Sequence, residues 1–243
     1  MTRSDLMLWV VLPYAAVAIF AVGHVWRYRR DQYTWTSRST QLLESRALTI
    51  GSNLFHLGAL AAIGGHVLGI LVPESWTRAV GIDNDAYHLL AGVGGVVAGL
   101  AVIFGMLVLI WRRARFPRVR ATTTRADVLV YALLAAVIFT GMAATLTGNW
   151  IGDHVEYRDT VAPWFRGLLI LDPDPDLMVG VPFIFQFHVT AAFVLYAAWP
   201  FSRLVHAWSV PLGYFRRSPV LYRSRTGRRP EAAGVLSRGE VTR

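Results

Sequence analysis

Long apolar stretches that alternate with short polar loops organise this chain. The apolar stretches cover residues 6–26, 49–71, 88–111, 127–147 and 181–202. A helix needs roughly 20 mainly apolar residues to cross the hydrocarbon core of a bilayer, and each stretch meets that length. The pattern predicts an all-α integral membrane protein with five transmembrane helices.

Polar residues and prolines predict where these helices begin and bend. Thr124, followed by Asp127, is typical of a helix N-cap with an acidic first turn. The acidic, proline-containing segment 148–180 has room for a short surface helix. We expect the fifth helix to pass through Pro200, to bend there, and to continue to His206.

The arginines predict the orientation of the helices. With the N-terminus outside, the cytoplasmic segments are 27–48, 112–126 and 203–243. The outer segments then hold four arginines, which leaves 20 of the 24 on the cytoplasmic side, and they hold ten of the 15 acidic residues. Cytoplasmic loops of membrane proteins are enriched in positive charge. We therefore expect an outer N-terminus and a cytoplasmic C-terminus.

Composition agrees with a multi-pass protein of the cell (cytoplasmic) membrane. Hydrophobic residues make up 54% of the chain and charged residues 16%. We expect a membrane domain at 1–215 and an arginine-rich cytoplasmic tail at 216–243. The net charge of +9 suits loops that face anionic membrane lipids and a partner protein. The basic residues follow the topology and no stacking platform accompanies them, so we expect no nucleic-acid partner.

Histidines are the candidate metal ligands. The chain has no cysteine, which excludes disulfides, cysteine-bound zinc, cysteine-ligated iron–sulfur clusters and CxxCH haem attachment. His56 and His66 lie in the second apolar stretch, and His188 and His206 lie in or just after the fifth. An ionisable side chain inside a membrane is costly unless it is partnered, so it indicates a functional site. The simplest explanation of four such residues is axial ligation of two haems stacked across the membrane.

One pairing of these histidines matches their expected heights. The second helix runs outward and the fifth inward, so His56 pairs with His206 on the cytoplasmic side and His66 with His188 on the outer side. Ten residues rise about 15 Å and eighteen about 27 Å, which leaves an offset of about 6 Å for each pair. A bend at Pro200 absorbs that offset. On a continuous fifth helix, His188 and His206 lie about five turns apart on one face.

A lone histidine in an apolar helix is more often a hydrogen-bonded residue of the bundle than a metal ligand. The four histidines above differ because they pair in height on antiparallel helices, with glycines nearby. His24 and His88 lie near membrane ends and His154 lies in a loop, so we interpret these three as interfacial or surface residues.

Several motifs resemble one known family. They are QYTW (32–35), SNLFHLG (52–58), GGH (64–66), PRVRATTT (117–124), FIFQFH (183–188) and PFSRLVHAWSVP (200–211). With these motifs the chain resembles, over about residues 10–225, the gamma subunit of membrane-bound respiratory nitrate reductase. The motifs include all four histidines, and the two longest motifs are the most specific.

The resemblance implies a dihaem cytochrome b that anchors its complex in the membrane. Quinol, either menaquinol or ubiquinol, is expected to be oxidised near the outer haem, held by His66 and His188, with protons released outside. Electrons are expected to reach the inner haem, held by His56 and His206, and then an iron–sulfur cluster of the beta subunit. Nitrate is expected to be reduced at a molybdenum cofactor in the alpha subunit, and not on this chain.

Three arginines are candidates for binding the haem propionates. Arg112 and Arg113 lie at the inner end of the third stretch, and Arg203 follows the fifth. A guanidinium fork suits a carboxylate. The alternative is that the three arginines only anchor the helices at the cytoplasmic surface.

The resemblance also implies a quinol pocket at Gly65 and His66. The family often has a lysine in the outer loop before the third helix. This chain reads DNDAYHLL at 83–90 and contains no lysine. His88 or Asp85 is the candidate substitute.

Two other functions compete with a nitrate reductase subunit. One is a related dihaem quinol-interacting subunit of a sulfur or heterodisulfide enzyme, which differs in its partner proteins. The other is a haem-free transporter whose histidines relay protons. A transporter is expected to have intramembrane carboxylates and an internal inverted repeat, whereas Asp127 lies at a helix entrance and five helices do not divide into equal halves.

Overall fold

The computed structural model describes residues 2–151 and 155–209, which form helices and connecting loops. Five helical segments are long and apolar enough to cross a membrane: Arg3–Arg30, Arg46–Leu71, Asn84–Arg115, Arg125–Ile151 and Phe183–Phe201. They coincide with the apolar stretches to within a few residues, so the predicted all-α fold with five membrane-spanning helices is confirmed. The tail predicted at 216–243 lies outside the described residues.

Each span consists of a long α-helix, and most are extended by a short turn of another helix type. The α-helices are α1 (Arg3–Leu6), α2 (Leu12–Arg30), α3 (Arg46–His66), α4 (Glu74–Ala79), α5 (Asn84–Arg115), α6 (Pro117–Arg120), α7 (Arg125–Leu146), α8 (Val161–Leu169) and α9 (Phe183–Ala198). The π-helical turns are Met7–Val11, Val67–Leu71 and Thr147–Ile151, and the 3-10 turns are Gln32–Thr34, Pro175–Met178, Trp199–Phe201 and Arg203–Trp208.

The predicted start of α7 is confirmed in detail. The backbone N–H of Asp127 donates to the Thr124 hydroxyl (3.2 Å), and the backbone N–H of Thr124 donates to the Asp127 carboxylate (3.0 Å). This reciprocal capping box satisfies two backbone donors that have no partner within the helix. Local sequence therefore determines where the fourth span begins.

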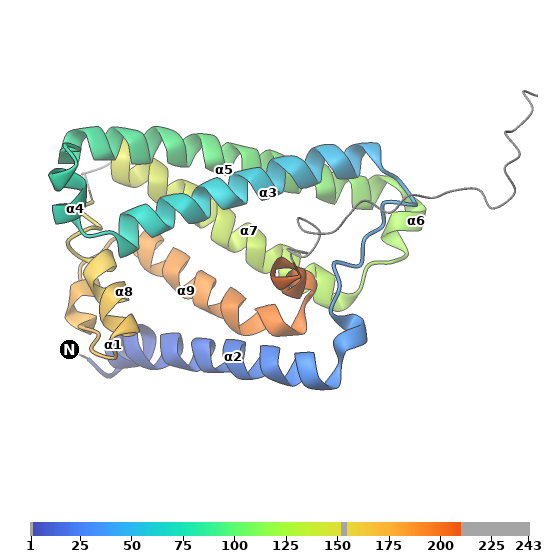
Figure 1. Cartoon of the computed structure of the whole chain (residues 1–243), viewed down its shortest axis with the longest axis horizontal. Coiled ribbons are helices and arrows are strands. Elements are labelled where there is room, and N and C mark those ends of the chain that lie inside the picture. The colour runs from blue at the N-terminus through green and yellow to red at the C-terminus, as the bar shows by residue number, and fades with distance from the viewer. Residues whose placement is uncertain (1, 152–154, 210–243) are drawn as a thin grey trace, which may run out of the picture. The chain divides into compact units, whose positions relative to one another are not determined.

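The long helices lie side by side in the order α3, α5, α7, α9, α2 (Figure 1). α3 packs along α5, α7 packs on both α5 and α9, and α2 packs on α9. The N-terminus, α4 and α8 gather at one end of the bundle, and α6 lies at the other (Figure 1). We call these the outer and inner ends, after the predicted topology. α3, which carries His56 and His66, and α9, which carries His188, do not pack along each other within the described residues.

Glycines allow α3 and α5 to approach closely. A Cβ atom on Gly105 of α5 would lie 2.4 Å from the backbone nitrogen of Phe55, and a Cβ on Gly58 of α3 would lie 2.8 Å from the carbonyl oxygen of Ala98. Both distances are too short for a side chain, and backbone atoms cannot rotate aside. Small residues have this role at many helix interfaces in membranes.

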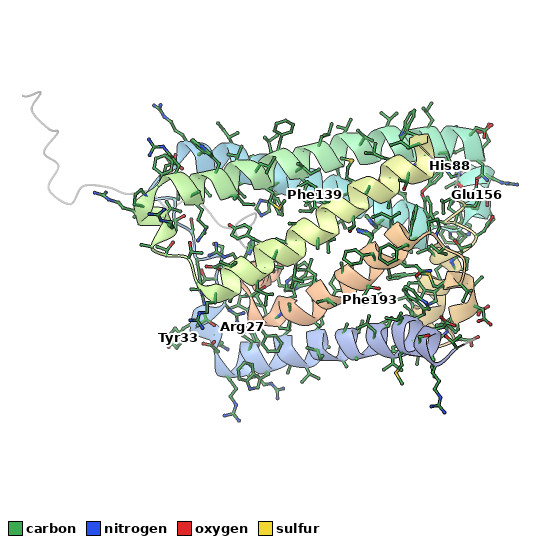
Figure 2. The ribbon with its side chains drawn as sticks, turned by 180° about the vertical axis from the view of Figure 1, so that it is seen from behind. Arg27, Tyr33, His88, Phe139, Glu156 and Phe193 are labelled. Atoms are coloured by element: carbon green, nitrogen blue, oxygen red, sulfur yellow. The ribbon has the colours of Figure 1, made fainter. Side chains whose placement is uncertain are left out.

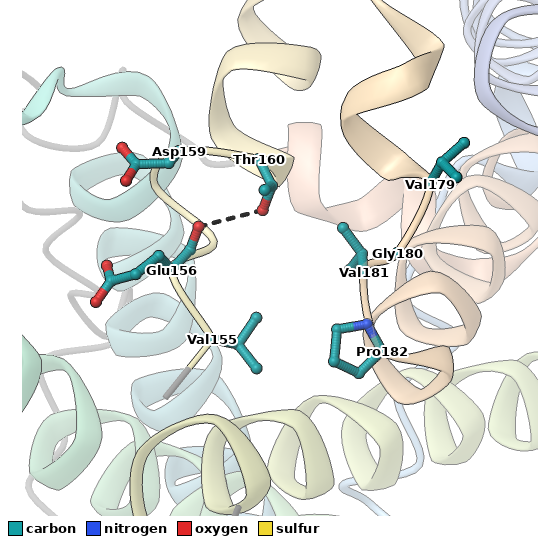
Figure 3. A pocket seen from close by; sticks show the side chains of 8 residues that line it. All are labelled: Val155, Glu156, Asp159, Thr160, Val179, Gly180, Val181 and Pro182. Atoms are coloured by element: carbon teal, nitrogen blue, oxygen red, sulfur yellow. Dashed lines mark hydrogen bonds between the residues drawn. The ribbon is translucent and has the colours of Figure 1, made fainter. Parts of the chain in front are cut away.

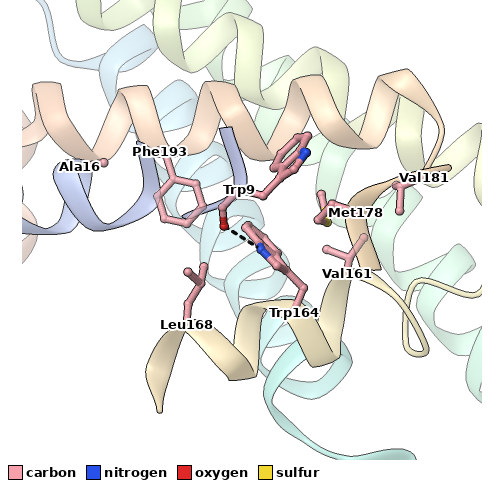
Figure 4. Close-up of a cluster of buried hydrophobic side chains, with 8 residues drawn as sticks. All are labelled: Trp9, Ala16, Val161, Trp164, Leu168, Met178, Val181 and Phe193. Atoms are coloured by element: carbon pink, nitrogen blue, oxygen red, sulfur yellow. Dashed lines mark hydrogen bonds between the residues drawn. The ribbon is translucent and has the colours of Figure 1, made fainter. Parts of the chain in front are cut away.

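The main buried cluster caps the outer end of the bundle (Figure 4). Trp164 of α8 is completely buried, its indole N–H donates to the carbonyl of Trp9 (2.9 Å), and the two indole rings meet edge to face. Phe193 of α9 packs against the same tryptophan. The short helix predicted within 148–180 is therefore present as α8, and it ties the first span to the last.

The last span differs from the predicted continuous helix. α9 ends at Ala198, and Ser202 is extended (φ −123°, ψ 178°) before the 3-10 turn Arg203–Trp208, which leaves the line of α9 (Figure 1). Pro200 has no N–H and its ring crowds the preceding turn, so the helix stops here instead of bending. The predictions of a helix that continues to His206, and of both histidines on one face of it, are wrong.

Replacing Gly105 by alanine should push α3 and α5 apart and lower the free energy of unfolding by about 1–3 kcal/mol, the usual range for overpacking. Thermal unfolding in detergent measures the effect. Gly94→Ala is the matched control, because a Cβ there meets no atom within 4 Å. Equal stability of the two variants would contradict the close-packing interpretation.

Candidate functional site: two histidine pairs

Four histidines meet as two pairs between α3 and the last span. The ring centres of His56 and His206 lie 5.9 Å apart at the inner end, with an angle of 74° between the ring planes. The ring centres of His66 and His188 lie 6.0 Å apart toward the outer end, with an angle of 32°. These are the two pairs that the height argument grouped. The helix break after α9 is what allows His206 to reach His56.

Each of the four rings has its Nδ1 atom hydrogen-bonded to a backbone carbonyl. The partners are Ser52 for His56 (2.7 Å), Ala62 for His66 (2.7 Å), Val137 for His188 (3.0 Å) and Arg203 for His206 (2.6 Å). A carbonyl oxygen only accepts, so Nδ1 carries the proton and Nε2 keeps its lone pair. This is the usual arrangement of a metal-binding histidine, whose second nitrogen is held by a carbonyl or carboxylate.

The ring separations fit one metal ion within each pair. A metal–nitrogen bond of about 2.0 Å, with about 1.1 Å from nitrogen to ring centre, places two facing ring centres about 6.2 Å apart. The observed 5.9 and 6.0 Å are close to that value. Among the described residues, no group of three or more histidine, cysteine or acidic side chains is arranged to hold a metal. Two donors are too few for structural zinc but match haem, which takes two axial ligands.

A cavity of about 470 Å³ adjoins the inner pair. His56 and His206 line it, together with apolar side chains such as Met106 of α5 and Leu134 of α7. The volume lies in the range of about 300–1,000 Å³ that is typical of small-molecule and cofactor sites. The inner pair thus faces a partly open space lined by apolar side chains and by many polar and charged ones.

The three arginines predicted to bind propionates all line this cavity, but their side chains differ in what they already bind. The buried guanidinium of Arg112 donates to the side chain and carbonyl of Thr40 and to the carboxylate and carbonyl of Glu44. Hydrogen bonds from the Ala47 amide and from Arg112 hold the pKa of Glu44 below its usual value. Arg112 therefore fastens the loop before α3 to α5.

Arg203 and Arg113 meet at Asp127, which is almost fully buried. Nε of Arg203 donates to the Asp127 carboxylate (2.8 Å), and Arg113 lies 4.0 Å from its second oxygen while donating to Thr123 (2.7 Å). The terminal nitrogens of Arg203 donate no hydrogen bond to a described residue. Arg203 is thus available to an anionic group in the cavity through both terminal nitrogens, whereas all three nitrogens of Arg112 are already engaged.

Glycines also shape the surroundings of the outer pair. A Cβ on Gly141 of α7 would lie 2.8 Å from Cε1 of His188, so the missing side chain makes room for that ring. Gly64 and Gly65, next to His66, have no atom within 4 Å of the position where a Cβ would lie. A flat ring therefore has access to α3 beside His66.

A polar cluster that the sequence did not reveal lies one turn beyond His66. The hydroxyls of Tyr87 and Tyr157 are hydrogen-bonded (2.9 Å), and a Cβ on Gly69, in the π-helical turn after α3, would lie 2.8 Å and 3.0 Å from their oxygens. Burial raises the pKa of Tyr157. The buried guanidinium of Arg158 lies over the Tyr87 ring at 4.0 Å, and two of its nitrogens have no hydrogen-bond partner among the described residues. In the sequence, the one indication of this cluster is that Arg158 is among the four arginines of the outer segments.

His88 extends this cluster toward the outer surface. Its Nε2 lies 3.2 Å from the carboxylate of Glu156, and both residues are at the outer end of the bundle (Figure 2). Glu156 also lines a pocket of about 270 Å³ between segments 155–160 and 179–182 (Figure 3). Asp85, the other substitute considered for the lysine, is exposed on the first turn of α5.

His24 differs from the four paired histidines because its Nε2 atom is already hydrogen-bonded to another side chain. Its Nδ1 bonds to the carbonyl of Phe20 (2.7 Å), but its Nε2 accepts a hydrogen bond from the indole of Trp208 (3.1 Å). Both ring nitrogens are therefore occupied, as expected for a histidine with a structural role. His154 lies outside the described residues.

Comparison with known proteins gives a consistent result. Residues 5–225 match the family model described as nitrate reductase gamma subunit. The nitrate reductase gamma chain of Bacillus subtilis (strain 168) is 43% identical over 223 residues, which cover 92% of this chain and 100% of that protein. The respiratory nitrate reductase 2 gamma chain of Escherichia coli (strain K12) is 34% identical over 216 residues, covering 88% and 95%.

A longer relative is also similar. The nitrate reductase-like protein NarX of Mycobacterium tuberculosis (strain ATCC 25618 / H37Rv) is 46% identical over 220 residues, which cover 90% of this chain. The match spans 34% of that protein, so this chain corresponds to about a third of its length.

Replacing Asp127 by leucine should lower the free energy of unfolding by about 3–5 kcal/mol, because it leaves two arginines without their shared carboxylate. Denaturant titration in detergent measures this change. Asp85→Asn removes an exposed carboxylate from the first turn of α5 and should change stability by about 0.5 kcal/mol or less. A small effect at Asp127 would show that the arginines find other partners.

Proposed function

This chain belongs to the nitrate reductase gamma subunit family, and from that we propose that it is the membrane-bound cytochrome b subunit of a respiratory nitrate reductase. In this proposal it holds two haem b groups, oxidises quinol at its outer end, and delivers electrons to an iron–sulfur beta subunit at its inner end. Nitrate is reduced on a molybdenum-containing alpha subunit. The observation that carries the proposal is the pair of bis-histidine arrangements, each spaced for one metal ion.

The histidine pairs suit electron transfer more than chemistry at the metal. Haem held by two imidazoles has no open coordination position, so it supplies one-electron transfer. Nδ1–carbonyl hydrogen bonds fix the four rings and increase the basicity of Nε2. His56 and His66 are ten residues apart on α3, a rise of about 15 Å, or about half of the hydrocarbon thickness. The two pairs therefore support a path across the membrane.

Contacts at the inner end favour Arg203 as a partner of a haem propionate. The residue lines the inner cavity and uses Nε for Asp127, which leaves its terminal nitrogens for a second carboxylate. Arg113 lies next to it against the same carboxylate. Arg112 is committed to the loop at 40–44, so we assign it the anchoring role.

For quinol we propose a site at Gly65 and His66, with His88 and Glu156 as the proton-accepting side chains. The open face at Gly64 and Gly65 admits the head group beside the outer pair. Oxidation removes two electrons and two protons from the quinol hydroxyls and leaves a quinone. His88 is bound to a partly exposed carboxylate, so a proton that reaches this pair has a route to the outer surface. These two residues take the place of the lysine that this chain lacks.

The family membership favours nitrate over the sulfur and heterodisulfide enzymes as the destination of the electrons. The transporter alternative needs a free intramembrane carboxylate. Asp127 is instead engaged by Arg203 and by the cap of α7. The contacts of this buried carboxylate at the start of a span therefore give a proton relay no support.

The haem assignment predicts a distinct spectrum for each pair of histidine variants. His66→Ala or His188→Ala should remove the outer haem and abolish quinol oxidation. His56→Ala or His206→Ala should remove the inner haem and leave the outer one reducible by quinol. Pyridine haemochrome quantitation and quinol-reduced minus oxidised spectra of the purified complex measure both effects.

His24→Ala is the control, and it should retain two haems because its Nε2 is bonded to Trp208. Two haems in the His66 or His188 variants, or different haems lost from the two members of one pair, would overturn the ligand assignment.

His88→Leu should lower the rate of quinol oxidation by about 100-fold or more, a typical contribution of a general base, without loss of haem. Steady-state assays with menaquinol and ubiquinol analogues, together with haem content, measure this. Asp85→Asn should keep normal turnover because its side chain is exposed. If Asp85→Asn were impaired and His88→Leu were not, the proton acceptor would have to be reassigned.

A further inference from the structure

We propose that Arg27 is a positioning residue that sets the orientation of His206 and thereby tunes the inner haem. The inference rests on the proposed function, because it assumes that His206 is an axial ligand. It concerns a residue of α2, a helix that contributes no member of either histidine pair.

Arg27 binds the broken end of the last span. Its side chain is 6% exposed at the inner end of α2 (Figure 2). Nη1 donates to the carbonyls of Pro200 (2.6 Å) and Ser202 (2.7 Å), and Nη2 donates to the carbonyl of Thr34 (2.7 Å). One guanidinium thus joins α2, the loop after it, and the segment that follows α9.

The break in α9 creates the need for such a donor. A helix that stops leaves its last carbonyls without intrahelical partners, and within an apolar bundle water does not supply them. The planar guanidinium presents several N–H donors in a fixed fork, and a cation is favoured at the negative end of a helix. Arg27 therefore stabilises the extended conformation of Ser202 over a continued helix.

A short chain of contacts leads from Arg27 to the His206 ring. Arg27 holds the carbonyl of Ser202, and the Ser202 hydroxyl accepts from the backbone N–H of Leu204 (3.1 Å), which starts the 3-10 turn. The carbonyl of Arg203, the residue between Ser202 and Leu204, accepts a hydrogen bond from Nδ1 of His206 (2.6 Å). Release of the Ser202 carbonyl would let the adjoining Arg203–Leu204 peptide shift, and the carbonyl of that peptide, Arg203 O, would turn the imidazole with it.

Two further contacts hold the same segment against α2. A Cβ on Gly23 would lie 2.6 Å from Cγ of Pro200, so the proline ring occupies the space that a side chain would need. Beyond His206, the indole of Trp208 donates to His24 of α2. The segment is thus held against α2 on both sides of His206. The hydrogen bonds from Arg27 are shorter than the one between Trp208 and His24.

The outer pair provides an internal reference. His188 lies within α9, and its Nδ1 bonds to Val137 of α7. His66 bonds to its own helix at Ala62. Neither contact involves Arg27 or the segment after α9, so a change at Arg27 should be felt at the inner haem alone.

Arg27→Gln in the intact complex tests this, with Arg30→Gln as the matched control. Arg30 is exposed on the same helix, and both variants lose one positive charge. The low-spin EPR signal of a bis-imidazole haem depends on the angle between its ring planes, here 74° for the inner pair and 32° for the outer pair. We expect a shifted or broadened inner signal and a shifted inner midpoint potential in Arg27→Gln, with the outer haem and the control unchanged.

Gly23→Ala tests the same contact without removing a charge. It should displace Pro200 and change the inner signal selectively, whereas Gly94→Ala, where a Cβ meets no atom within 4 Å, should not. The unchanged outer haem in each variant shows that the protein is folded. Wild-type inner signals and potentials in both Arg27→Gln and Gly23→Ala would overturn the proposal.

Hydrogen exchange of residues 199–209, measured on the same samples, separates this inference from the proposed function. If the wild-type complex holds two haems and the inner signals do not change, the positioning role is wrong and the proposed function stands. If the wild-type protein binds no haem, the proposed function fails and so does the tuning of a haem. In that case, faster hydrogen exchange in Arg27→Gln than in Arg30→Gln would still support the contact between Arg27 and the segment after α9. Equal exchange in the two variants would contradict that contact as well.

Discussion

The structure depends on how imidazoles are accommodated inside an apolar bundle. Each paired histidine must satisfy two ring nitrogens where water is scarce, and an unsatisfied polar group in hydrocarbon is costly. A backbone carbonyl binds Nδ1 in all four residues, from the preceding helical turn in α3, from α7 for His188, and from a 3-10 turn for His206. This leaves the lone pair of Nε2 free of the carbonyl contact, so the hydrogen bonds that lower the cost of burial also select the tautomer.

Helix packing keeps the paired rings 5.9 and 6.0 Å apart, measured between their centres. α3 and the last span meet through their imidazoles, while each packs along a different neighbour. Glycines at 58 and 105 hold α3 tightly on α5, and Gly141 gives the His188 ring its space against α7. Small side chains therefore stabilise the helix contacts on one side and leave room for a flat group on the other.

The two ends of the bundle are held together by different kinds of side chain. At the inner end, arginines bind backbone carbonyls and carboxylates: Arg27 holds the segment after α9, Arg112 the loop before α3, and Arg203 pairs with Asp127. At the outer end, tryptophans bury the first span against α8, and a tyrosine pair with Arg158 lies beyond His66. The inner end is thus held by arginine hydrogen bonds and ion pairs, and the outer end by tryptophan packing and a cluster of titratable side chains.

The sequence by itself determined the five spans, the cap at Thr124 and the pairs into which the histidines fall, because hydropathy, capping and helix rise are local properties. Tertiary structure alone decided that α9 stops at Ala198, that Arg112 serves a loop instead of the cavity, and that Arg158 and two tyrosines gather near Gly69. These features depend on hydrogen bonds between residues 68 to 175 positions apart, such as Arg112 to Glu44 and Arg27 to Ser202. The sequence shows Pro200 but not whether the helix bends or ends there, and the hydrogen bonds from Arg27 of α2 to the carbonyls of Pro200 and Ser202 favour the end.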